Sequence, residues 1–317
     1  MLYNLLYRLI CTHLHLMDPL SHLLSLYPVQ TALDVRCRFG APWVINHGGT
    51  PRGVAPYHLI VRGEAQVGEL TLQTGDIIVF PQGGAHQLHI GDPAQASTPH
   101  STPGLLRLES NEGDGPQTDI LCGEFHFDVD GSAGLLAALP EVLVVRTSGR
   151  PDAQSLRYLL RMLQEEAEAP RGGSEAIIRQ LASALFALLI RTWLEQTLAV
   201  PGLFGVLAER RLQAAMNGML TAPEKPWTLE DLADASHMSR ATFARLFKQA
   251  ANATPAEVLT QLRMARAARL LDDGRQAGDV AEAVGYQSEA AFNRAFKRQY
   301  GVGPGAYRRT ARGGASE

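Results

Sequence analysis

Two cysteines in the first half of the chain have contexts that suit thiol chemistry. Cys37 lies between Arg36 and Arg38, and cationic neighbours favour the reactive thiolate when they are also close in space. Cys122 lies in a strand-like run, Leu121–Phe127. Thiol oxidation is reversible as far as sulfenic acid or a disulfide, so such residues could form a switch. A buried, inert thiol is the alternative for each.

Histidines near the cysteines could face a ligand or a metal. The segment Gly75–His86 has the spacing G-x5-P-x-G-x2-H, which resembles the second motif of cupins, small β-barrels that can hold a metal or ligand inside. Metal-binding cupins usually also carry an H-x-H pair, and here His58 stands alone. We therefore expect His58 and His86 to line a ligand pocket or support the barrel, with no metal or cofactor. A partial metal site that includes His47 and His89 is the alternative.

The basic residues gather towards the end of the chain. The 317 residues carry a net charge of −3, but residues 227–312 contain 13 Lys and Arg against 9 Asp and Glu, a net +4, and the remainder carries −7. An anionic partner is therefore expected to bind the C-terminal part.

That C-terminal part contains two similar units, predicted to be helix-turn-helix motifs. The first is Trp227–Lys248 and the second Asp279–Tyr300. Thr228, Ser239 and Ser288 are expected helix caps, and Gly285 permits the turn of the second unit. The apolar residues expected to face inward are Leu229, Leu232, Ala233, Phe243, Leu246 and Phe247 in the first unit, and Phe292 and Phe296 in the second. A connecting helix over Leu259–Leu271 would carry Arg263, Arg266 and Arg269 on a basic flank.

The second unit extends into a long motif, Tyr286-x-Ser-x3-Phe-x-Arg-x-Phe-Lys-x3-Gly301-x2-Pro304-x2-Tyr307-Arg308. This motif resembles the signature of AraC/XylS-type transcription regulators, and the resemblance covers about a hundred residues from Leu207 onward. It implies two recognition helices that enter successive major grooves of DNA. The implied DNA-binding positions are Arg240, Ala241, Ala244, Arg245 and Lys248 in the first helix, and Glu289, Ala290, Asn293, Arg294 and Lys297 in the second.

These positions would not contribute equally. Alanines 241, 244 and 290 are too small to read base edges by hydrogen bonds, so direct readout would rest on Arg245, Asn293 and Arg294. Lys248 and Lys297 would contact phosphates and set the register.

Apolar periodicity predicts the elements that position these residues. Between Thr31 and about Arg146, short β-type runs lie at 43–46, 57–62, 69–72, 76–81, 87–90 and 120–129, and Asp92–Gly115 is expected to be a long mobile loop. After Pro151 the period changes to that of helices: 156–169, a second from Ser174 through Trp193, and a third over Leu207–Leu220.

The fold class expected is α+β: an N-terminal cupin-like β-barrel with helices, followed by an all-α domain with two helix-turn-helix motifs. Residues 18–150 would form the sensor domain and 205–312 the DNA-binding domain. Between them, 151–200 would supply helical packing or dimerisation and a linker.

Composition excludes several other classes. Hydrophobic residues make up 45% and charged residues 19%, as in an ordinary globular protein. The first seventeen residues are apolar but are interrupted by Arg8 and two histidines, short of a membrane span. Met17 is an alternative start, which would exclude Cys11. Three widely spaced cysteines do not form a disulfide scaffold, so a cytoplasmic protein is expected.

The whole chain resembles the reactive-chlorine-sensing group of cupin-bearing AraC regulators, in which Cys37-x5-Trp43 and Cys122-Gly-x-Phe match in context. The resemblance implies an activator that is not an enzyme and binds double-stranded DNA. An oxidant or small-molecule effector, RNA polymerase and a second copy of the chain are the other implied partners. The alternatives are a metal-dependent cupin enzyme fused to a DNA-binding domain and a DNA-repair methyl acceptor, whose cysteine cluster is missing here.

Overall fold

The computed structural model describes residues 18–128, 135–136, 138–169, 171–197 and 202–313. The chain divides into two compact units. The sheet unit contains Val29–Val129 and Leu139–Leu198, and the helical unit contains Met1–Pro28, Asp130–Ala138 and Ala199–Glu317. The expectations for residues 1–17, including Cys11 and Met17, lie outside the described residues.

The larger sheet of the sheet unit has seven strands in the order β11-β6-β3-β10-β1-β9-β8. The long strands β1 (Val29–Gly40) and β10 (Gln117–Phe127) pair antiparallel at its centre. The others are β3 (Val54–Arg62), β6 (Ile77–Val79), β8 (His100–Thr102), β9 (Arg107–Ser110) and β11 (Leu143–Val145). Strand β9 runs parallel to β1, and the remaining neighbours are antiparallel.

The smaller sheet has four strands in the order β2-β7-β4-β5. They are β2 (Trp43–His47), β4 (Glu64–Val67), β5 (Leu70–Gln73) and β7 (His86–Ile90). One apolar cluster joins inward side chains of both sheets: Cys37, Phe39, Ile60, Ile78 and Ile120 from the larger sheet, and Trp43, Ala65, Leu72 and Leu88 from the smaller. This cluster is the interior of the predicted β-barrel, and Cys37 belongs to it.

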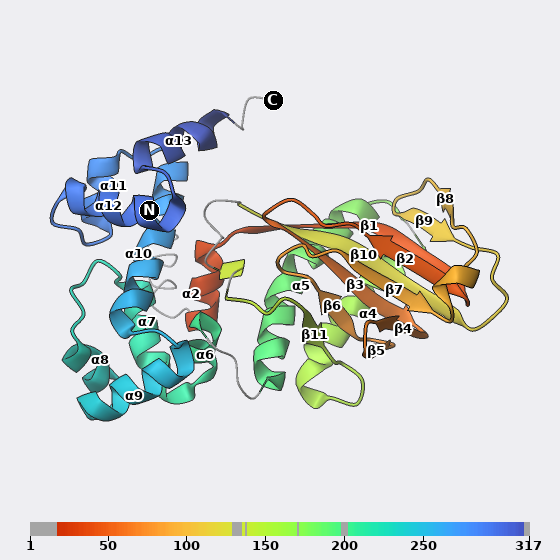
Figure 1. Cartoon of the computed structure of the whole chain (residues 1–317), viewed down its shortest axis with the longest axis horizontal. Coiled ribbons are helices and arrows are strands. Elements are labelled where there is room, and N and C mark those ends of the chain that lie inside the picture. Colours follow the sequence, from red (N-terminus) through yellow and green to blue (C-terminus); the bar gives the residue numbers. More distant parts are fainter. Residues whose placement is uncertain (1–17, 129–134, 137, 170, 198–201, 314–317) are drawn as a thin grey trace, which may run out of the picture. The chain divides into compact units, whose positions relative to one another are not determined.

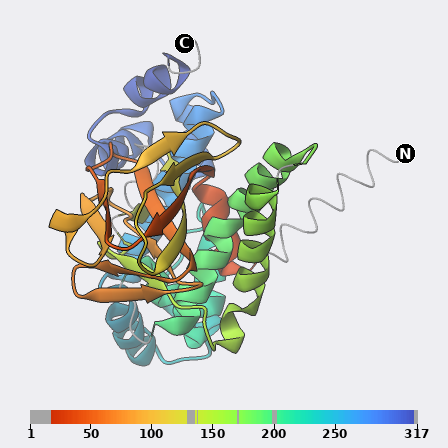
Figure 2. The same ribbon diagram turned by 90° about the vertical axis from the view of Figure 1, so that its right-hand side faces the viewer.

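Two helices cover the other face of the larger sheet. Helix α4 (Gln154–Glu168) packs against α5 (Ser174–Gln196), and α5 packs against β1 and β11; Figure 2 shows the two helices side by side. The Phe125 and Phe186 rings meet at 5.1 Å between centroids. Among the described residues, α5 is long and apolar enough to cross a membrane. Its fully buried Leu189 and its contacts with the sheet are typical of a core helix of a soluble protein.

Parts of the sheet unit differ from the expectations based on sequence. The expected mobile loop over Asp92–Gly115 is wrong, because it contains a short 3-10 helix (Pro93–Gln95) and the strands β8 and β9. Strand β1 was also missed, although it carries Cys37. Both errors have one cause: pairing with distant strands, such as β9 with β1, stabilises segments whose own sequences favour loops.

The helical unit consists of short helices around α10 (Pro255–Asp272), as Figure 1 shows. The first motif pairs α8 (Leu229–Ala235) with α9 (Arg240–Ala251), and the second pairs α11 (Ala277–Ala283) with α12 (Glu289–Tyr300). The others are α2 (Pro19–Leu26), α6 (Leu203–Ala208), α7 (Gln213–Thr221) and α13 (Pro304–Gly313), with a 3-10 turn at Arg210–Leu212. Helix α2, from the beginning of the chain, packs against α7 and α10.

The caps of both motifs are as predicted, but other details differ. The single helix expected over Leu207–Leu220 is wrong, because a break at Glu209 separates α6 from α7. Leu229 is 40% exposed and does not face inward, since it begins α8 at the surface. Leu246 is half-buried, whereas Phe243 and Phe247 are fully buried.

The three arginines expected on a basic flank of α10 bind other parts of the same unit. Arg263 donates from Nε to the Pro223 carbonyl at 2.6 Å, and Arg266 pairs with Glu224 at 3.0 Å. Arg269 donates to the carbonyl of Ser25 in α2. These contacts tie α2 and the loop before α8 to the connecting helix.

Candidate functional site

The two described cysteines meet inside the barrel. In the β1–β10 pairing, Cys37 lies opposite Ile120 and Cys122 lies opposite Val35, so the cysteines are diagonal neighbours on one face of the sheet. Their Sγ atoms are 4.0 Å apart, with both thiols free. Two residues 85 positions apart in sequence are therefore within reach of a disulfide.

A small movement of the strands would be needed to form that bond. A disulfide S–S bond is about 2.0 Å long, and diagonal residues on paired strands are normally slightly further apart than disulfide-linked ones. The β1–β10 register shifts between Leu33 and Val35, which leaves Asp34 as the extra residue next to the partner of Cys122. Such bulges locally disrupt a ladder, so the pairing is already loosened where movement is required.

The arginines beside Cys37 do not act on its thiol. Side chains alternate between the faces of a strand, so Arg36 and Arg38 point away from the barrel interior. Arg36 pairs with Glu168 at 3.0 Å and with Asp119 at 3.7 Å, and Arg38 pairs with Asp119 at 3.7 Å. The two arginines could favour the Cys37 thiolate only if they were close to its sulfur, and they are not.

Histidines contact the other thiol. His58 Nδ1 lies 3.0 Å from Cys122 Sγ, and His58 Nε2 lies 2.7 Å from His86 Nε2. His86 stacks between Phe80, at 3.5 Å between ring centroids, and His47, at 4.8 Å. His58 is 1% exposed, whereas His86 and His47 are half-buried, so this cluster leads from the core towards solvent.

The cupin-like glycine turn places His86. Gly83 has a φ of 68°, and a Cβ there would lie 2.1 Å from Thr50 Oγ1, so a glycine is required by both conformation and space. His89 alternates to the other face of β7 and contacts the Gly91 carbonyl instead. In the described part of the chain, no group of three or more His, Cys, Asp or Glu residues has a geometry that could hold a metal ion.

The hydrogen bonds determine the tautomer of each ring. His86 Nδ1 lies 2.8 Å from the Gly84 carbonyl, which can only accept, so Nδ1 carries the proton. In a neutral ring His86 Nε2 is then an acceptor, and His58 Nε2 must be the donor. His58 Nδ1 is consequently an acceptor, to which the Cys122 thiol donates a hydrogen bond.

The electrostatics agree with an uncharged cluster. Burial lowers the pKa of His58 well below its ordinary value, and His86 and His47 lower it further. Burial also lowers the pKa of His86 to about 4, against the opposing effect of the Gly84 carbonyl. The pKa of Cys122 is raised, first by the neighbouring Cys37 thiol and then by burial. At neutral pH the thiol is protonated and the two rings are neutral.

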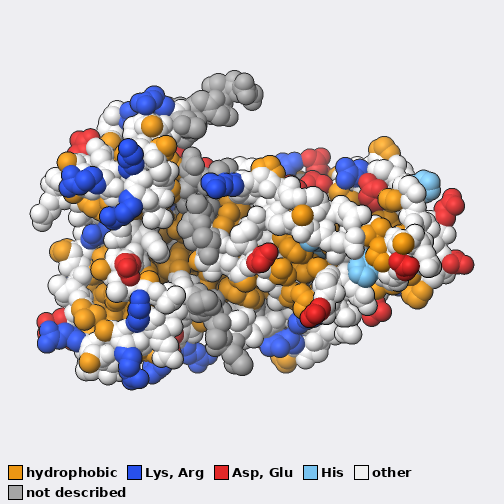
Figure 3. All heavy atoms as spheres, viewed as in Figure 1, with side chains coloured by type: hydrophobic (Ala, Val, Ile, Leu, Met, Phe, Trp, Pro, Cys, Tyr) orange, Lys and Arg blue, Asp and Glu red, His pale blue; other side chains and the backbone are white. Residues whose placement is uncertain are grey.

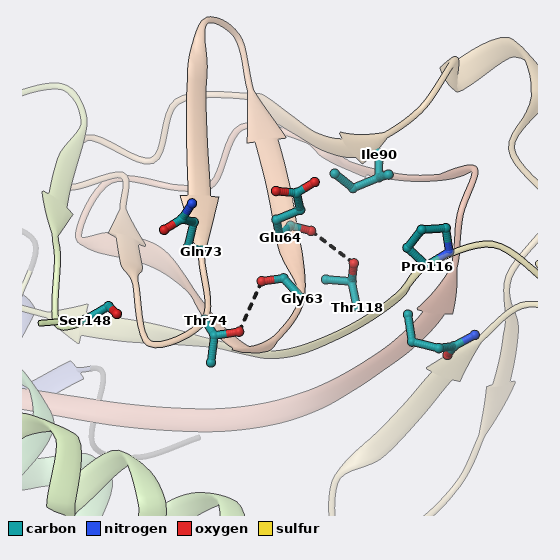
Figure 4. Close-up of a pocket in the computed structure, with 9 residues that line it drawn as sticks. Gly63, Glu64, Gln73, Thr74, Ile90, Pro116, Thr118 and Ser148 are labelled. Carbon is teal, nitrogen blue, oxygen red and sulfur yellow. Dashed lines mark hydrogen bonds between the residues drawn. The ribbon is translucent and has the colours of Figure 1, made fainter.

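A pocket of about 490 Å³ lies elsewhere in the sheet unit, between the β4–β5 hairpin and the start of β10 (Figure 4). Thr118 donates to the Glu64 carbonyl at 3.0 Å and Thr74 to the Gly63 carbonyl at 3.2 Å. Both hydroxyls are thereby engaged within the wall. His58 and His86, the expected ligand-facing residues, do not line this pocket.

The helical unit presents two recognition-type helices. The buried faces of α9 and α12 hold Phe243 and Phe247, and Phe292 and Phe296, respectively. Ser239 and Ser288 accept from the third residue of each helix at 3.3 Å. Eight of the ten expected DNA-binding positions are exposed: Arg240, Ala241, Arg245 and Lys248 on α9, and Glu289, Ala290, Arg294 and Lys297 on α12. Figure 3 shows Lys and Arg side chains gathered on this unit.

The other two positions are partly covered. Ala244 and Asn293 are half-buried, and Asn293 Oδ1 is buried without a hydrogen-bond partner. An unpaired buried amide oxygen costs free energy, and it leaves the amide NH2 group as the part that could reach outward. Arg240 lies 3.8 Å from Glu230, an exposed pair.

Comparison with known proteins identifies the family. Residues 18–195 match a cupin model and residues 232–310 match a helix-turn-helix domain model. The RCS-specific HTH-type transcriptional activator RclR of Escherichia coli is 33% identical over 93% of this chain and 99% of its own, and the HTH-type transcriptional regulator MtrA of Neisseria gonorrhoeae is 32% identical over 92% and 98%. The chain belongs to the AraC family of DNA-binding transcription regulators, in the group that carries an N-terminal cupin domain.

Solved structures also match the C-terminal part. The DNA-binding domain of AdpA, in complex with a target DNA, is 31% identical and covers 32% of this chain and 94% of that one, with a TM-score of 0.30. The relatives named above are transcriptional regulators, in agreement with the expectation of a regulator and not an enzyme.

Proposed function

We propose that this regulator is an oxidant-responsive activator whose cupin domain senses through Cys37 and Cys122. The observation that supports it is the 4.0 Å separation of two free thiols on adjacent strands inside the barrel. A relative that is 33% identical over nearly the whole chain is named as specific for RCS, reactive chlorine species. The chemistry of the pair and the name of the relative point to the same class of effector.

The reaction needs one equivalent of hypochlorous acid. One sulfur takes chlorine from the oxidant: its S–H bond and the Cl–O bond break, an S–Cl bond forms, and the oxygen leaves as water with the thiol proton. The second sulfur then attacks the first, the S–S bond forms, chloride leaves, and the second thiol proton goes to solvent. Two thiols are oxidised and one chlorine is reduced to chloride. A thiol reductant reverses the outcome.

The expected change in shape lies in strands β1 and β10, which must approach to form the bond. Strand β1 follows directly on α2, which packs in the helical unit against α10, the helix between the two motifs. We propose that residues 18–150 act as the sensor, 205–312 as the DNA-binding domain and 151–200 as the packing and linking segment, in a cytoplasmic protein that acts with RNA polymerase. Exposed Tyr158 and Met162, one turn apart on α4, offer an apolar contact for a homodimer.

The DNA contacts proposed are the exposed positions of α9 and α12. Arg245 and Arg294 would read bases, Lys248 and Lys297 would bind phosphates, and Asn293 would use its amide NH2 group. The net charge of +4 over residues 227–312 supports binding to an anionic duplex.

The test is affinity for DNA from upstream of the gene and its neighbours at fixed salt. Reduced protein is compared with protein given stoichiometric hypochlorous acid. A several-fold change that dithiothreitol reverses is the expected result. Tight binding that is indifferent to oxidation would contradict thiol sensing, retain the regulator, and direct attention to small ligands of the cupin domain.

A further inference from the structure

Cys122 contacts His58, which is in turn hydrogen-bonded to His86. Formation of a disulfide by itself requires only the two thiols, so the histidines need another explanation. His58 sits wholly buried between Cys122 Sγ and His86 Nε2, and the tautomers fixed by the Gly84 carbonyl align every proton in one direction, away from the sulfur. In this series of hydrogen bonds, Cys122 donates to His58, His58 donates to His86, and His86 donates to the Gly84 carbonyl. The outer ring, His86, is half-buried and so can exchange protons with solvent.

We propose that His58 and His86 form a proton relay that deprotonates Cys122 as it attacks the oxidant, which makes Cys122 the attacking thiol and Cys37 the resolving one. The biological meaning of the relay rests on the proposed oxidant sensing. The relay itself is a property of Cys122 chemistry and can be measured without DNA.

The protons and electrons of the step balance with a peroxide as well as with hypochlorous acid. Cys122 Sγ attacks one peroxide oxygen, the S–O bond forms and the O–O bond breaks. The thiol proton passes to His58 Nδ1 while the proton on His58 Nε2 passes to His86 Nε2. The departing oxygen takes a proton from solvent and leaves as water, and His86 returns its extra proton to solvent. Cys37 then displaces the sulfenic oxygen as a second water.

The resting cluster explains why a relay is needed. A thiolate is the nucleophile, but the neighbouring Cys37 thiol and burial raise the pKa of Cys122, so little thiolate exists at neutral pH. Burial likewise disfavours a stable imidazolium at His58. A base that removes the proton only during the reaction, and passes it to the ring nearest solvent, avoids both charged states.

The surrounding titratable groups do not replace the relay. Cys37 on β1 contacts Cys122 and His47 on β2 stacks on His86, while Glu124 on β10 lies two residues from Cys122 on the same face. Glu124 Oε2 is paired with His126 Nε2 at 3.1 Å. His47 stacks on His86, and its Nδ1 is bonded to the Gly48 carbonyl at 2.7 Å.

The experiment measures the rate of Cys122 oxidation in the full chain by hydrogen peroxide, a small oxidant that stays neutral over the range studied. Remaining thiols are alkylated and each cysteine is quantified by peptide mass spectrometry. Because His86 has a pKa of about 4, the relay stays neutral and competent at higher pH. The wild-type rate should therefore be nearly constant from about pH 7.5 down to about pH 5.5, and fall below that as His86 is protonated.

His86→Gln keeps a hydrogen-bond acceptor for His58 but cannot carry a proton. We expect its rate to be roughly 100-fold lower at about pH 6 and to rise about tenfold per pH unit, as for an unassisted thiol. A solvent deuterium effect should be present in wild type and weak in the variant. His89→Gln, on the same strand but outside the cluster, is the matched control and should behave as wild type.

A separate measurement tests whether Cys122 is the attacking thiol and Cys37 the resolving one. In Cys37→Ser, Cys122 should form a sulfenic acid that dimedone traps, whereas in Cys122→Ser the remaining Cys37 should react at least about tenfold more slowly. Equal rates and equal pH slopes in wild type and His86→Gln would overturn the relay, even if DNA binding still responded to oxidant. A relay with the expected pH profile in a protein whose DNA affinity ignores oxidant would overturn the proposed sensing alone.

Discussion

The two candidate functional regions of this regulator place their chemistry in opposite environments. In the sheet unit, Cys37, His58 and Cys122 come from three strands and meet inside the barrel. In the helical unit, the expected contacts lie on the outside of α9 and α12, each within about three helical turns. The buried group can react only with a small molecule that enters. The exposed helices can bind a macromolecule, and a single change there removes one contact among several.

The largest effect expected is the loss of the oxidant response on removal of either thiol. Cys37→Ser and Cys122→Ser each eliminate a partner of the disulfide, so oxidant should no longer change DNA affinity, while affinity in the reduced state stays at the wild-type value. Titration of labelled DNA with and without hypochlorous acid measures both. Cys11→Ser is the control and should keep the response. A normal response in both Cys37→Ser and Cys122→Ser would contradict sensing by the buried thiols.

The exposed helices also depend on the turns that precede them, and Gly285 tests how strongly. It adopts a φ of 81°, and a Cβ there would lie 2.3 Å from the Glu224 carbonyl oxygen. The left-handed backbone alone costs a non-glycine residue about 1 to 2 kcal/mol, so Gly285→Ala should lose at least that much stability in thermal or urea unfolding.

The matched control for Gly285 lies in the turn of the first motif. His237 has a φ of 53° there, so this turn already tolerates a side chain. His237→Gly should change stability by less than about 1 kcal/mol, because the relief of strain is offset by the greater freedom of glycine in the unfolded chain. Equal changes in stability for Gly285→Ala and His237→Gly would show that the second turn does not depend on glycine more than the first.

Base reading should come next in size. Arg294→Ala should weaken binding to the specific operator by about 1 to 3 kcal/mol and relax the base preference at one position, if Arg294 makes a bidentate contact. Competition against a set of single-base operator variants measures this. Unchanged affinity and preference would remove Arg294 from the readout, and the oxidant response should persist in either case.

The smallest effect is expected at a phosphate contact. Lys297→Ala should weaken binding to specific and random DNA alike and lower the slope of log affinity against log salt by about 1, because one fewer counterion is released. Affinities at four salt concentrations give the slope. A slope equal to that of wild type would mean that Lys297 does not touch a phosphate.

The helical unit was the easier part to predict from sequence. Ser239 with Phe243 and Phe247, and Ser288 with Phe292 and Phe296, mark the second helix of each motif, because a cap and an apolar face are local signals within a dozen residues. The sheet unit was harder. Strand β1 was missed and the segment with β8 and β9 was expected to be a loop, since strand formation there depends on partners far away in sequence.

The sequence by itself determined which residue types are available: two cysteines in a cupin-like half, a glycine-spaced His86, and two capped helices with arginine and lysine on their outer faces. Only the tertiary structure decided which of them meet. It paired Cys37 with Cys122, inserted His58 between that thiol and His86, and turned Arg36 and Arg38 away from the sulfur. The reason is that the pairing register of β1, β10 and β3 sets which side chains share the barrel interior, and register is a property of the assembled sheet.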